Sequence, residues 1–357
     1  MRKIFGGLQK LLTEPRYRNR LIHDFEIKNG RTHFFSKPVC LQIESTNKCN
    51  LNCVMCARPY YDKEKNILGD MSIETFEKIV PLIKLAESVI LFGYGEPLIA
   101  KNFWHFLKRC KELGAKTAIY TNGVKLDKEN SLNLIEGGLD NLSLSLDAAR
   151  EETFKSIRGY SLRKIIENIN GLGELKSRLR RQNPAIAISY TLMENNLYEL
   201  PEMIDLAAVI GASRVSVTHM MIYSNGLDKQ SVFHYTEAAK PVFEEAFLRA
   251  AKKGIHIELP NLHPIVAECK QPFEMLFVNW NGKVRPCCTA AFVSGEFSFP
   301  IGDLSEESLG TIWNNENMLE IRRGLIGKGR MLPQCVGCGF RMKDIRGHKR
   351  YLDKAIT

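Results

Sequence analysis

Three cysteines, Cys49, Cys53 and Cys56, lie close together in the sequence, separated by three and then by two residues. Thiolates are the usual protein ligands of iron–sulfur clusters. Three of them on one short loop would hold three irons of a cubane cluster and leave the fourth iron open. A zinc site is the alternative, but zinc prefers four ligands and no histidine lies near this loop. The spacing therefore predicts a 4Fe–4S cluster that can bind a further molecule.

This Cys-x3-Cys-x2-Cys loop resembles the signature of the radical S-adenosylmethionine (SAM) superfamily, where it follows the first strand of a barrel. The resemblance implies that the open iron binds the amino and carboxylate groups of SAM. It also implies reductive cleavage of SAM to a 5′-deoxyadenosyl radical, which abstracts hydrogen from a substrate. Cys49, Cys53 and Cys56 would be catalytic in this sense. Met55 stands where the family often has an aromatic residue, and its thioether can still pack against an adenine ring.

The run Gly93-Tyr-Gly95-Glu96-Pro97 is similar to the Gly-Gly-Glu-Pro motif of the same family. Gly93 and Gly95 allow the backbone to approach a ligand closely. Glu96 offers an acceptor for an ammonium group, which by the resemblance belongs to the methionine part of SAM. We therefore expect Gly93, Gly95, Glu96 and Pro97 to contact this cofactor.

Polar residues at later strand ends are further candidates for binding SAM. Asn122 follows the third strand-like run. Ser145 and Asp147 lie at the end of the fourth, where the resemblance implies polar side chains that bind the SAM ribose or carboxylate. Arg158 lies in an Ile-Arg-Gly run that resembles a family element whose arginine pairs with the SAM carboxylate. Alternatively, Asn122 and Asp147 cap the helices that follow them, and Arg158 is a surface residue.

Two more polar residues follow the fifth and sixth strand-like runs, Asn195 and His219. They are expected at the same end of the sheet as the SAM candidates. His219 and Asp147 are candidates for a general base, although a histidine at such a position is more often structural.

Strand-like and helix-like runs alternate from residue 38 to about residue 259. The strand-like runs are Val39–Ile43, Val89–Phe92, Thr117–Tyr120, Leu142–Leu146, Ala185–Tyr190 and Arg214–Thr218. The helix-like stretches are 72–87, 102–114, 127–137, 151–178, 197–210 and 234–253. Six repeated strand–helix units predict an α/β protein with a parallel sheet, because each parallel crossover needs a helix. The resemblance implies that this sheet curls into a partial (β/α)6 barrel, with the chemistry at the carboxyl ends of its strands.

A second set of cysteines lies beyond residue 259, where the alternation stops. Cys269 and Cys287 flank a predicted hairpin, and Cys335 and Cys338 form a Cys-x2-Cys pair. Four cysteine ligands in two pairs that lie far apart in the sequence are typical of a metal site with no open coordination position. Cys288 could replace Cys287, and structural zinc is the alternative to a cluster.

This region resembles the SPASM/twitch extension of radical SAM enzymes, which binds auxiliary 4Fe–4S clusters. The similar runs begin at Ile301, Thr311 and Ile321. No cysteine follows Cys338, so the shorter twitch form with one auxiliary cluster fits best. The remaining cysteines, Cys40 and Cys110, are expected in the core.

The expected domains are a basic extension over 1–38, the barrel over 39–259, a smaller hairpin-and-helix cluster-binding domain over 260–340 and a basic tail over 341–357. The chain of 357 residues has a net charge of +10, and the two ends contribute +6 and +4 of it. Such ends could contact an anionic surface, although a solvated basic face is more common. With no signal peptide and no membrane-spanning run, we expect a cytoplasmic protein.

The fully ligated auxiliary cluster suits electron transfer. The resemblance therefore first suggests dehydrogenation of a sugar, a cyclitol or another small molecule by a radical SAM oxidoreductase. The auxiliary cluster would accept the electron, and a flavodoxin or ferredoxin would serve as reductant. Alternatives are the modification of a ribosomal peptide and a redox-neutral epimerisation. From a different class, a non-catalytic iron–sulfur or zinc protein that binds RNA would leave the motif at Gly93–Pro97 without a purpose.

Overall fold

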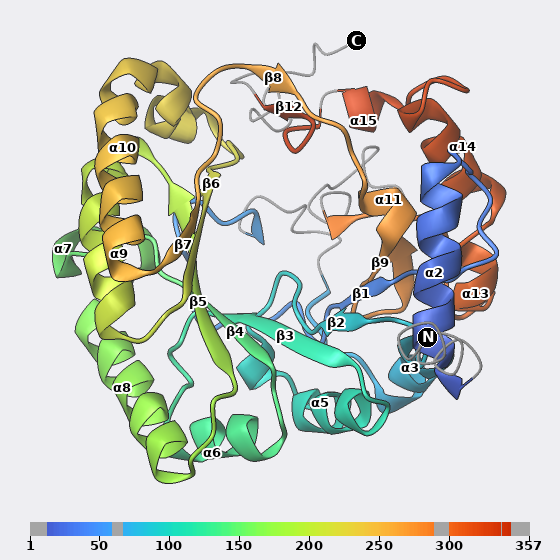
Figure 1. The fold of residues 1–357 in the computed structure, drawn as a ribbon, viewed down its shortest axis with the longest axis horizontal. Coiled ribbons are helices and arrows are strands. Elements are labelled where there is room, and N and C mark those ends of the chain that lie inside the picture. The colour runs from blue at the N-terminus through green and yellow to red at the C-terminus, as the bar shows by residue number, and fades with distance from the viewer. Residues whose placement is uncertain (1–12, 59–66, 289–299, 337, 344–357) are drawn as a thin grey trace, which may run out of the picture. The chain divides into compact units, whose positions relative to one another are not determined.

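The computed structural model describes residues 13–58, 67–288, 300–336 and 338–343. By compactness, the chain divides into two units. The first comprises Met1–Lys48, Ile67–Ala118 and Glu268–Val336, and the second comprises Cys49–Asn66, Ile119–Ala267 and Gly337–Thr357. Each unit contains part of the α/β architecture that the alternating pattern predicts (Figure 1).

The first unit is built on parallel strands extended by an antiparallel hairpin. Its strands, in spatial order, are β11 (Gly302–Asp303), β10 (Lys283–Arg285), β9 (Met275–Val278), β1 (Cys40–Ile43), β2 (Ser88–Ile90) and the first half of β3 (Lys116–Thr121). Strand β9 pairs in parallel with β1, Met275 opposite Cys40. Its helices are α2 (Pro15–Lys28), α3 (Ile73–Glu77), α4 (Val80–Ile83), η2 (Pro97–Ile99), α5 (Phe103–Glu112), α11 (Gln271–Glu274), α13 (Leu309–Ile312), α14 (Glu316–Leu325) and α15 (Pro333–Val336). The hairpin that follows Cys269 in the sequence is therefore joined directly to the strand that precedes the Cys49–Cys56 loop.

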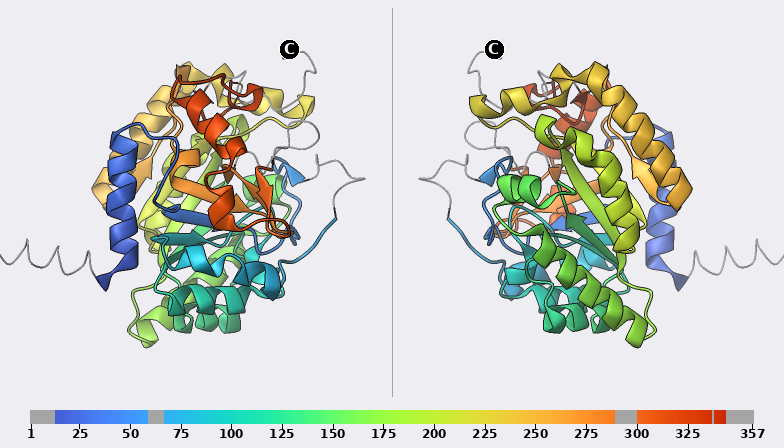
Figure 2. Two further views of the ribbon diagram at one scale, coloured as in Figure 1. Left: turned by 90° about the vertical axis from the view of Figure 1, so that its right-hand side faces the viewer. Right: turned by 90° about the vertical axis from the view of Figure 1, so that its left-hand side faces the viewer.

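The second unit continues the strand–helix alternation. After the second half of β3 come β4 (Asn141–Ser145), β5 (Ala185–Leu192), β6 (Arg214–His219) and β7 (His256–Glu258), which lie side by side and parallel from β4 to β7. Its helices are α6 (Lys128–Glu136), α7 (Glu151–Arg158), α8 (Leu162–Arg178), η3 (Glu194–Glu199), α9 (Leu200–Val209), η4 (Asn225–Gln230), η5 (Val232–His234) and α10 (Thr236–Lys253). Figures 1 and 2 show α8, α9 and α10 on the outer side of these strands. A small antiparallel pair, β8 (Ile265–Val266) with β12 (Met342–Lys343), completes the unit.

All six predicted strands are present, with ends within a few residues of those expected. The predicted turn at Asn281–Gly282 joins β9 to β10, and Gly282 has a φ of 85°. Ser72 caps helix α3 by accepting the Thr75 N–H. Local sequence signals thus locate most elements correctly.

Two predicted helices are each divided into two shorter helices. The stretch 72–87 forms α3 and α4, and Pro81 lies in the first turn of α4, where its missing N–H is tolerated. The stretch 151–178 forms α7 and α8, because Gly159 takes a φ of 69° and ends α7. Helix α2 was not predicted. The spacing of Ile4, Phe5, Leu8, Leu11 and Leu12 also predicts an apolar helix face flanked by Lys and Arg, and these residues lie outside the described part of the chain. No helix in the described part of the chain is long and apolar enough to cross a membrane.

Candidate functional site

The loop that carries Cys49, Cys53 and Cys56 forms a compact turn in the second unit. The Cys56 N–H donates to the Cys53 carbonyl at 3.1 Å, and the Val54 N–H donates to the Ile157 carbonyl at 3.0 Å. The second bond holds the loop against the end of α7. All three thiols are half-buried. Within the described residues, no group of three or more His, Cys, Asp and Glu side chains is arranged to hold a single metal ion.

Two of these thiols have nitrogen donors close by. The Asn122 amide Nδ2 lies 3.8 Å from Cys49 Sγ and 2.8 Å from the side-chain oxygen of Asn50. Arg158 Nη1 lies 3.7 Å from Cys53 Sγ. A set of three thiols with N–H donors around them suits a negatively charged iron–sulfur cluster, because each donor stabilises charge on sulfur. The residues present therefore fit this cofactor.

Asp147 and Arg158 form a buried ion pair behind the cysteine loop. Arg158 Nε donates to Asp147 Oδ2 at 2.6 Å, and the other oxygen of Asp147 accepts the Thr191 N–H at 2.7 Å. Asp147 is fully buried and Arg158 is 9% exposed. Burial lowers the pKa of Arg158, but the charges of Asp147 and the Cys53 thiol outweigh it, so the pKa is raised overall. Asp147, predicted as a SAM ligand or base, contacts protein groups through both oxygens and orients Arg158.

The Gly93–Pro97 motif lies in the first unit against the residues that precede Cys49. The Gly95 N–H donates to the Thr46 carbonyl at 3.2 Å, and the Glu96 N–H donates to the Lys48 carbonyl at 2.8 Å. A Cβ atom on Gly95 would overlap these same two carbonyls. Glu96 is 2% exposed, and its Oε1 accepts the Leu98 N–H at 3.1 Å. Pro97 begins η2, so the motif is a rigid turn at the end of β2.

Glu44, a buried carboxylate at the end of β1, was not predicted to belong to the site. Its two oxygens accept the Tyr94 N–H at 2.8 Å, the Asn279 amide at 2.9 Å and the Trp280 N–H at 3.2 Å. Burial raises its pKa, and the bonds from Asn279, Tyr94 and Trp280 oppose that shift. Glu44 therefore connects the Gly93–Pro97 motif with the β9–β10 hairpin. The available sequence signal was a carboxylate directly after a buried strand and five residues before Cys49.

The other predicted residues of the second unit lie at strand ends as expected. Ser145 ends β4 and is half-buried, as is Met55 in the cysteine loop. The Asn195 N–H donates to the side-chain oxygen of Gln230 at 3.1 Å. His219 Nε2 lies 2.8 Å from the Asn261 carbonyl, and its ring stacks on Phe233 with centroids 4.3 Å apart. Burial lowers the pKa of His219, so this ring is neutral at pH 7.

The second cysteine set is divided between the units. Cys269, Cys287 and Cys335 belong to the first unit, whereas Cys338 belongs to the second. Cys288 Sγ lies 3.4 Å from the side-chain oxygen of Gln271. Cys338 is buried, and its carbonyl accepts the Arg341 N–H at 2.9 Å. The joint binding of one cluster by Cys269, Cys287, Cys335 and Cys338 stays a prediction.

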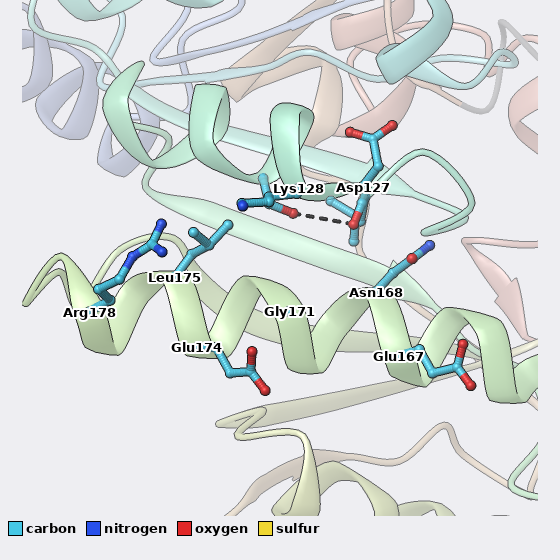
Figure 3. A pocket seen from close by; sticks show the side chains of 10 residues that line it. Asp127, Lys128, Glu167, Asn168, Gly171, Glu174, Leu175 and Arg178 are labelled. Carbon is cyan, nitrogen blue, oxygen red and sulfur yellow. Dashed lines mark hydrogen bonds between the residues drawn. The ribbon is translucent and has the colours of Figure 1, made fainter.

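A pocket of about 410 Å³ lies between α6 and α8 in the second unit (Figure 3). Carboxylates and cations of both helices line it, among them Asp127, Glu174 and Arg178. None of the predicted site residues lines this pocket. It therefore belongs to the helical layer and not to the cysteine loop.

Comparisons with known proteins agree with this geometry. Residues 43–207 match the model of the radical SAM superfamily, and residues 269–339 match that of the SPASM iron–sulfur cluster-binding domain. The structure is similar to that of Streptococcus suis SuiB bound to S-adenosylmethionine, with a TM-score of 0.68 at 16% identity, over 95% of this chain and 82% of that one. This likeness supports the partial-barrel fold. The chain therefore belongs to the radical SAM superfamily and carries a SPASM domain, and its cofactors are 4Fe–4S clusters and SAM.

Two kinds of curated relative are similar over most of the chain. A Pyrococcus furiosus protein named "Tungsten-containing aldehyde ferredoxin oxidoreductase cofactor-modifying protein" is 26% identical over 84% of this chain and 87% of its own. A PqqA peptide cyclase of Bradyrhizobium diazoefficiens is 26% identical over 90% of this chain and 84% of its own. A Gluconobacter oxydans PqqA peptide cyclase is 25% identical over 87% of this chain and 86% of its own. These relatives do not support the expected oxidation of a sugar or cyclitol, and the two peptide cyclases favour the peptide alternative.

Proposed function

We propose that this radical SAM enzyme modifies a peptide by abstracting hydrogen from one of its carbon atoms. The similarity to PqqA peptide cyclases carries this proposal, because it extends over 90% of this chain and 84% of the relative. Its closest alternative is the small-molecule dehydrogenation expected from the sequence, which the relatives named above do not support. Whether this enzyme is an oxidoreductase depends on which of these two reactions it catalyses.

In this proposal Cys49, Cys53 and Cys56 hold the cluster that binds SAM. When bound, the cluster and SAM supply a 5′-deoxyadenosyl radical. The contacts of the Gly93–Pro97 turn support its role as a fixed cradle, since Gly95 is in contact with the backbone that leads into Cys49. Asn122, Ser145, Arg158, Met55 and Glu96 remain our candidates for SAM contacts, and Asp147 orients Arg158.

Cys269, Cys287, Cys335 and Cys338 are the proposed ligands of one auxiliary 4Fe–4S cluster, which would accept an electron during the reaction. A flavodoxin or a ferredoxin is the proposed physiological reductant. Iron and sulfide counts after anaerobic reconstitution test this ligand assignment. We expect about eight irons per chain in the wild type and about four in Cys335→Ala/Cys338→Ala. Cys110→Ala, which removes a buried thiol outside both sets, is the matched control and should keep the wild-type count.

The substrate class is tested by coupling SAM cleavage to product formation. The reduced holoenzyme should form 5′-deoxyadenosine faster with precursor peptides encoded beside its gene than with no substrate. Mass spectrometry should detect a modified peptide, and Cys53→Ala should produce neither result. Turnover with cyclitols or sugars and none with peptides would restore the small-molecule reading.

A second candidate follows from the Pyrococcus furiosus relative, whose name describes modification of a tungsten-enzyme cofactor. Its identity of 26% equals that of the peptide cyclases. The same assay decides between them, because a cofactor-modifying enzyme would leave every peptide unchanged in mass. Incubation with the cofactor of a tungsten enzyme would then stimulate SAM cleavage.

A further inference from the structure

Two polar side chains from outside the cysteine loop contact its sulfur atoms. Asn122 follows β3 and donates its amide towards Cys49 Sγ at 3.8 Å. Arg158 ends α7 and directs Nη1 at Cys53 Sγ, 3.7 Å away. Both residues were predicted from the sequence as SAM ligands. Their observed contacts are with sulfur atoms of the proposed cluster ligands.

The Arg158 guanidinium is fixed in this orientation by its own partners. Asp147 accepts from Nε at 2.6 Å and is itself held by the Thr191 N–H. The Asn196 amide also donates to the Asp147 carbonyl at 2.7 Å. Arg158 can contact Asp147 and Cys53 at the same time because the planar guanidinium group presents several N–H donors. Asp147 is therefore a positioning residue for the Arg158 cation beside Cys53.

The Asn122 amide is also oriented from both sides. Its oxygen accepts the Val124 N–H at 3.0 Å, which leaves Nδ2 directed towards Asn50 and Cys49. The turn after Asn122 is held by α8, because the Asn168 amide donates to the Gly123 carbonyl at 3.0 Å. Asn168 lies at the wall of the α6–α8 pocket (Figure 3). The donor at Cys49 is thus part of the folded scaffold and not a mobile surface group.

We infer that Asn122 and Arg158 raise the reduction potential of the cluster held by Cys49, Cys53 and Cys56. This inference rests on the proposed function of that loop. Hydrogen bonds to ligand sulfurs and nearby positive charge stabilise the reduced cluster, which carries one more negative charge than the oxidised form. Arg158 acts in a buried site, where a charge is weakly screened. The role differs from SAM binding because it operates with no SAM present.

The experiment is an anaerobic redox titration of the reconstituted full-length enzyme, followed by electron paramagnetic resonance without SAM. The signal that changes when SAM is later added identifies the relevant cluster. Asn122→Asp replaces the donor with an anion of the same size, and its matched control is Asn141→Asp at the exposed start of β4. Arg158→Met removes the cation, and its control is Lys155→Met on the exposed side of the same helix.

We expect the midpoint potential of Asn122→Asp and of Arg158→Met to become more negative than that of the matched controls. A tenfold loss in the equilibrium constant for reduction is about 59 mV for one electron, and each variant should reach at least that value. Arg158→Lys keeps the positive charge but lacks the planar guanidinium group, so it should shift the midpoint potential by a smaller amount. If Arg158→Met fails to hold a cluster, Asn122→Asp and Arg158→Lys decide the outcome.

Potentials equal to those of the controls, or shifts seen only after SAM is added, would overturn the inference and leave Asn122 and Arg158 with the proposed SAM contact alone. Peptide modification would stand in that case. A wild-type enzyme with no SAM-responsive signal would instead overturn the proposed function, and this inference with it.

Discussion

Gly95 shows how a single residue shapes the proposed SAM site. Its N–H bonds to the Thr46 carbonyl, and the Lys48 carbonyl lies equally close to where a side chain would begin. The requirement is for close approach and not for an unusual backbone angle, since Gly95 is not among the glycines with positive φ. The sequence motif therefore has a steric reason in this chain.

Gly95→Ala should displace the Gly93–Pro97 turn from the residues that lead into Cys49. We expect an unfolding free energy lower by about 1–3 kcal/mol, because the added methyl overlaps backbone that cannot rotate away. SAM affinity, measured by equilibrium binding to the reconstituted enzyme, should fall as well. Gly171→Ala in α8 is the matched control: apart from its chain neighbours and the backbone of its own helix, no atom lies within 4 Å of the added methyl. That control should gain about 0.5–1 kcal/mol from helix propensity. Equal SAM affinity in both variants would contradict this steric role.

Glu44 joins two elements that are 235 residues apart in the sequence, β1 and the β9–β10 hairpin. Its carboxylate accepts three N–H groups in an interior position, and Arg285 in turn donates to the side-chain oxygen of Asn279 at 2.6 Å. The carboxylate lies within contact distance of Gly93, where an added Cβ would be only 2.5 Å from Glu44 Cγ. The Gly93 turn and the hairpin thus share one buried acceptor.

Glu44→Ala should reduce the unfolding free energy by about 2–4 kcal/mol, because it leaves the donors of Tyr94, Asn279 and Trp280 without their acceptor. Glu44→Gln keeps one carbonyl oxygen and should lose less. Urea unfolding monitored by tryptophan fluorescence measures both changes. Glu77→Ala, at an exposed position on α3, supplies the control. An alanine variant as stable as that control would show that water replaces the carboxylate.

Elements set by short-range signals were predictable from the sequence, and elements set by distant partners were not. The β9–β10 turn follows from Asn281–Gly282, and the α3 start follows from Ser72. No feature of the sequence near β9 indicates that β9 pairs with β1, because that pairing depends on packing between residues that are far apart in the sequence. For the same reason the cysteine spacing indicated a cluster loop, whereas the Arg158 contact with Cys53 required the fold.

In the first unit, side chains from early and late in the sequence pack together in one buried group. The Arg322 guanidinium lies over the rings of both Phe34 and Trp313, 4.6 and 4.0 Å from their centroids. It donates to the Thr32 carbonyl at 2.9 Å and to the Pro272 carbonyl at 2.8 Å. The segment after helix α2 is therefore held to α14 of the SPASM region, and Phe34 is part of this unit's core.

His23 makes the stability of this buried group of side chains depend on pH. It is 1% exposed, stacks on Phe34 with ring centroids 5.4 Å apart, and lies 3.2 Å from the Ser36 hydroxyl. Burial and then the charge of Arg20 lower its pKa from 6.5 to about 4. Between those values the unfolded chain binds a proton that the folded chain does not. The stabilising contribution of neutral His23 is therefore complete above pH 6.5 and is lost as the pH falls towards 4.

From about pH 7.5 to about pH 5, the wild type should lose about 2 kcal/mol of unfolding free energy through this histidine. His23→Phe keeps a ring against Phe34 and cannot titrate, so its stability should depend less on pH by that amount. Other groups titrate in both proteins, and the difference between the two urea-unfolding curves at each pH isolates His23. Parallel pH profiles would mean that His23 is protonated as readily in the folded protein as in the unfolded chain. In that case the contacts around Phe34 would have to accommodate a cation beside Arg322.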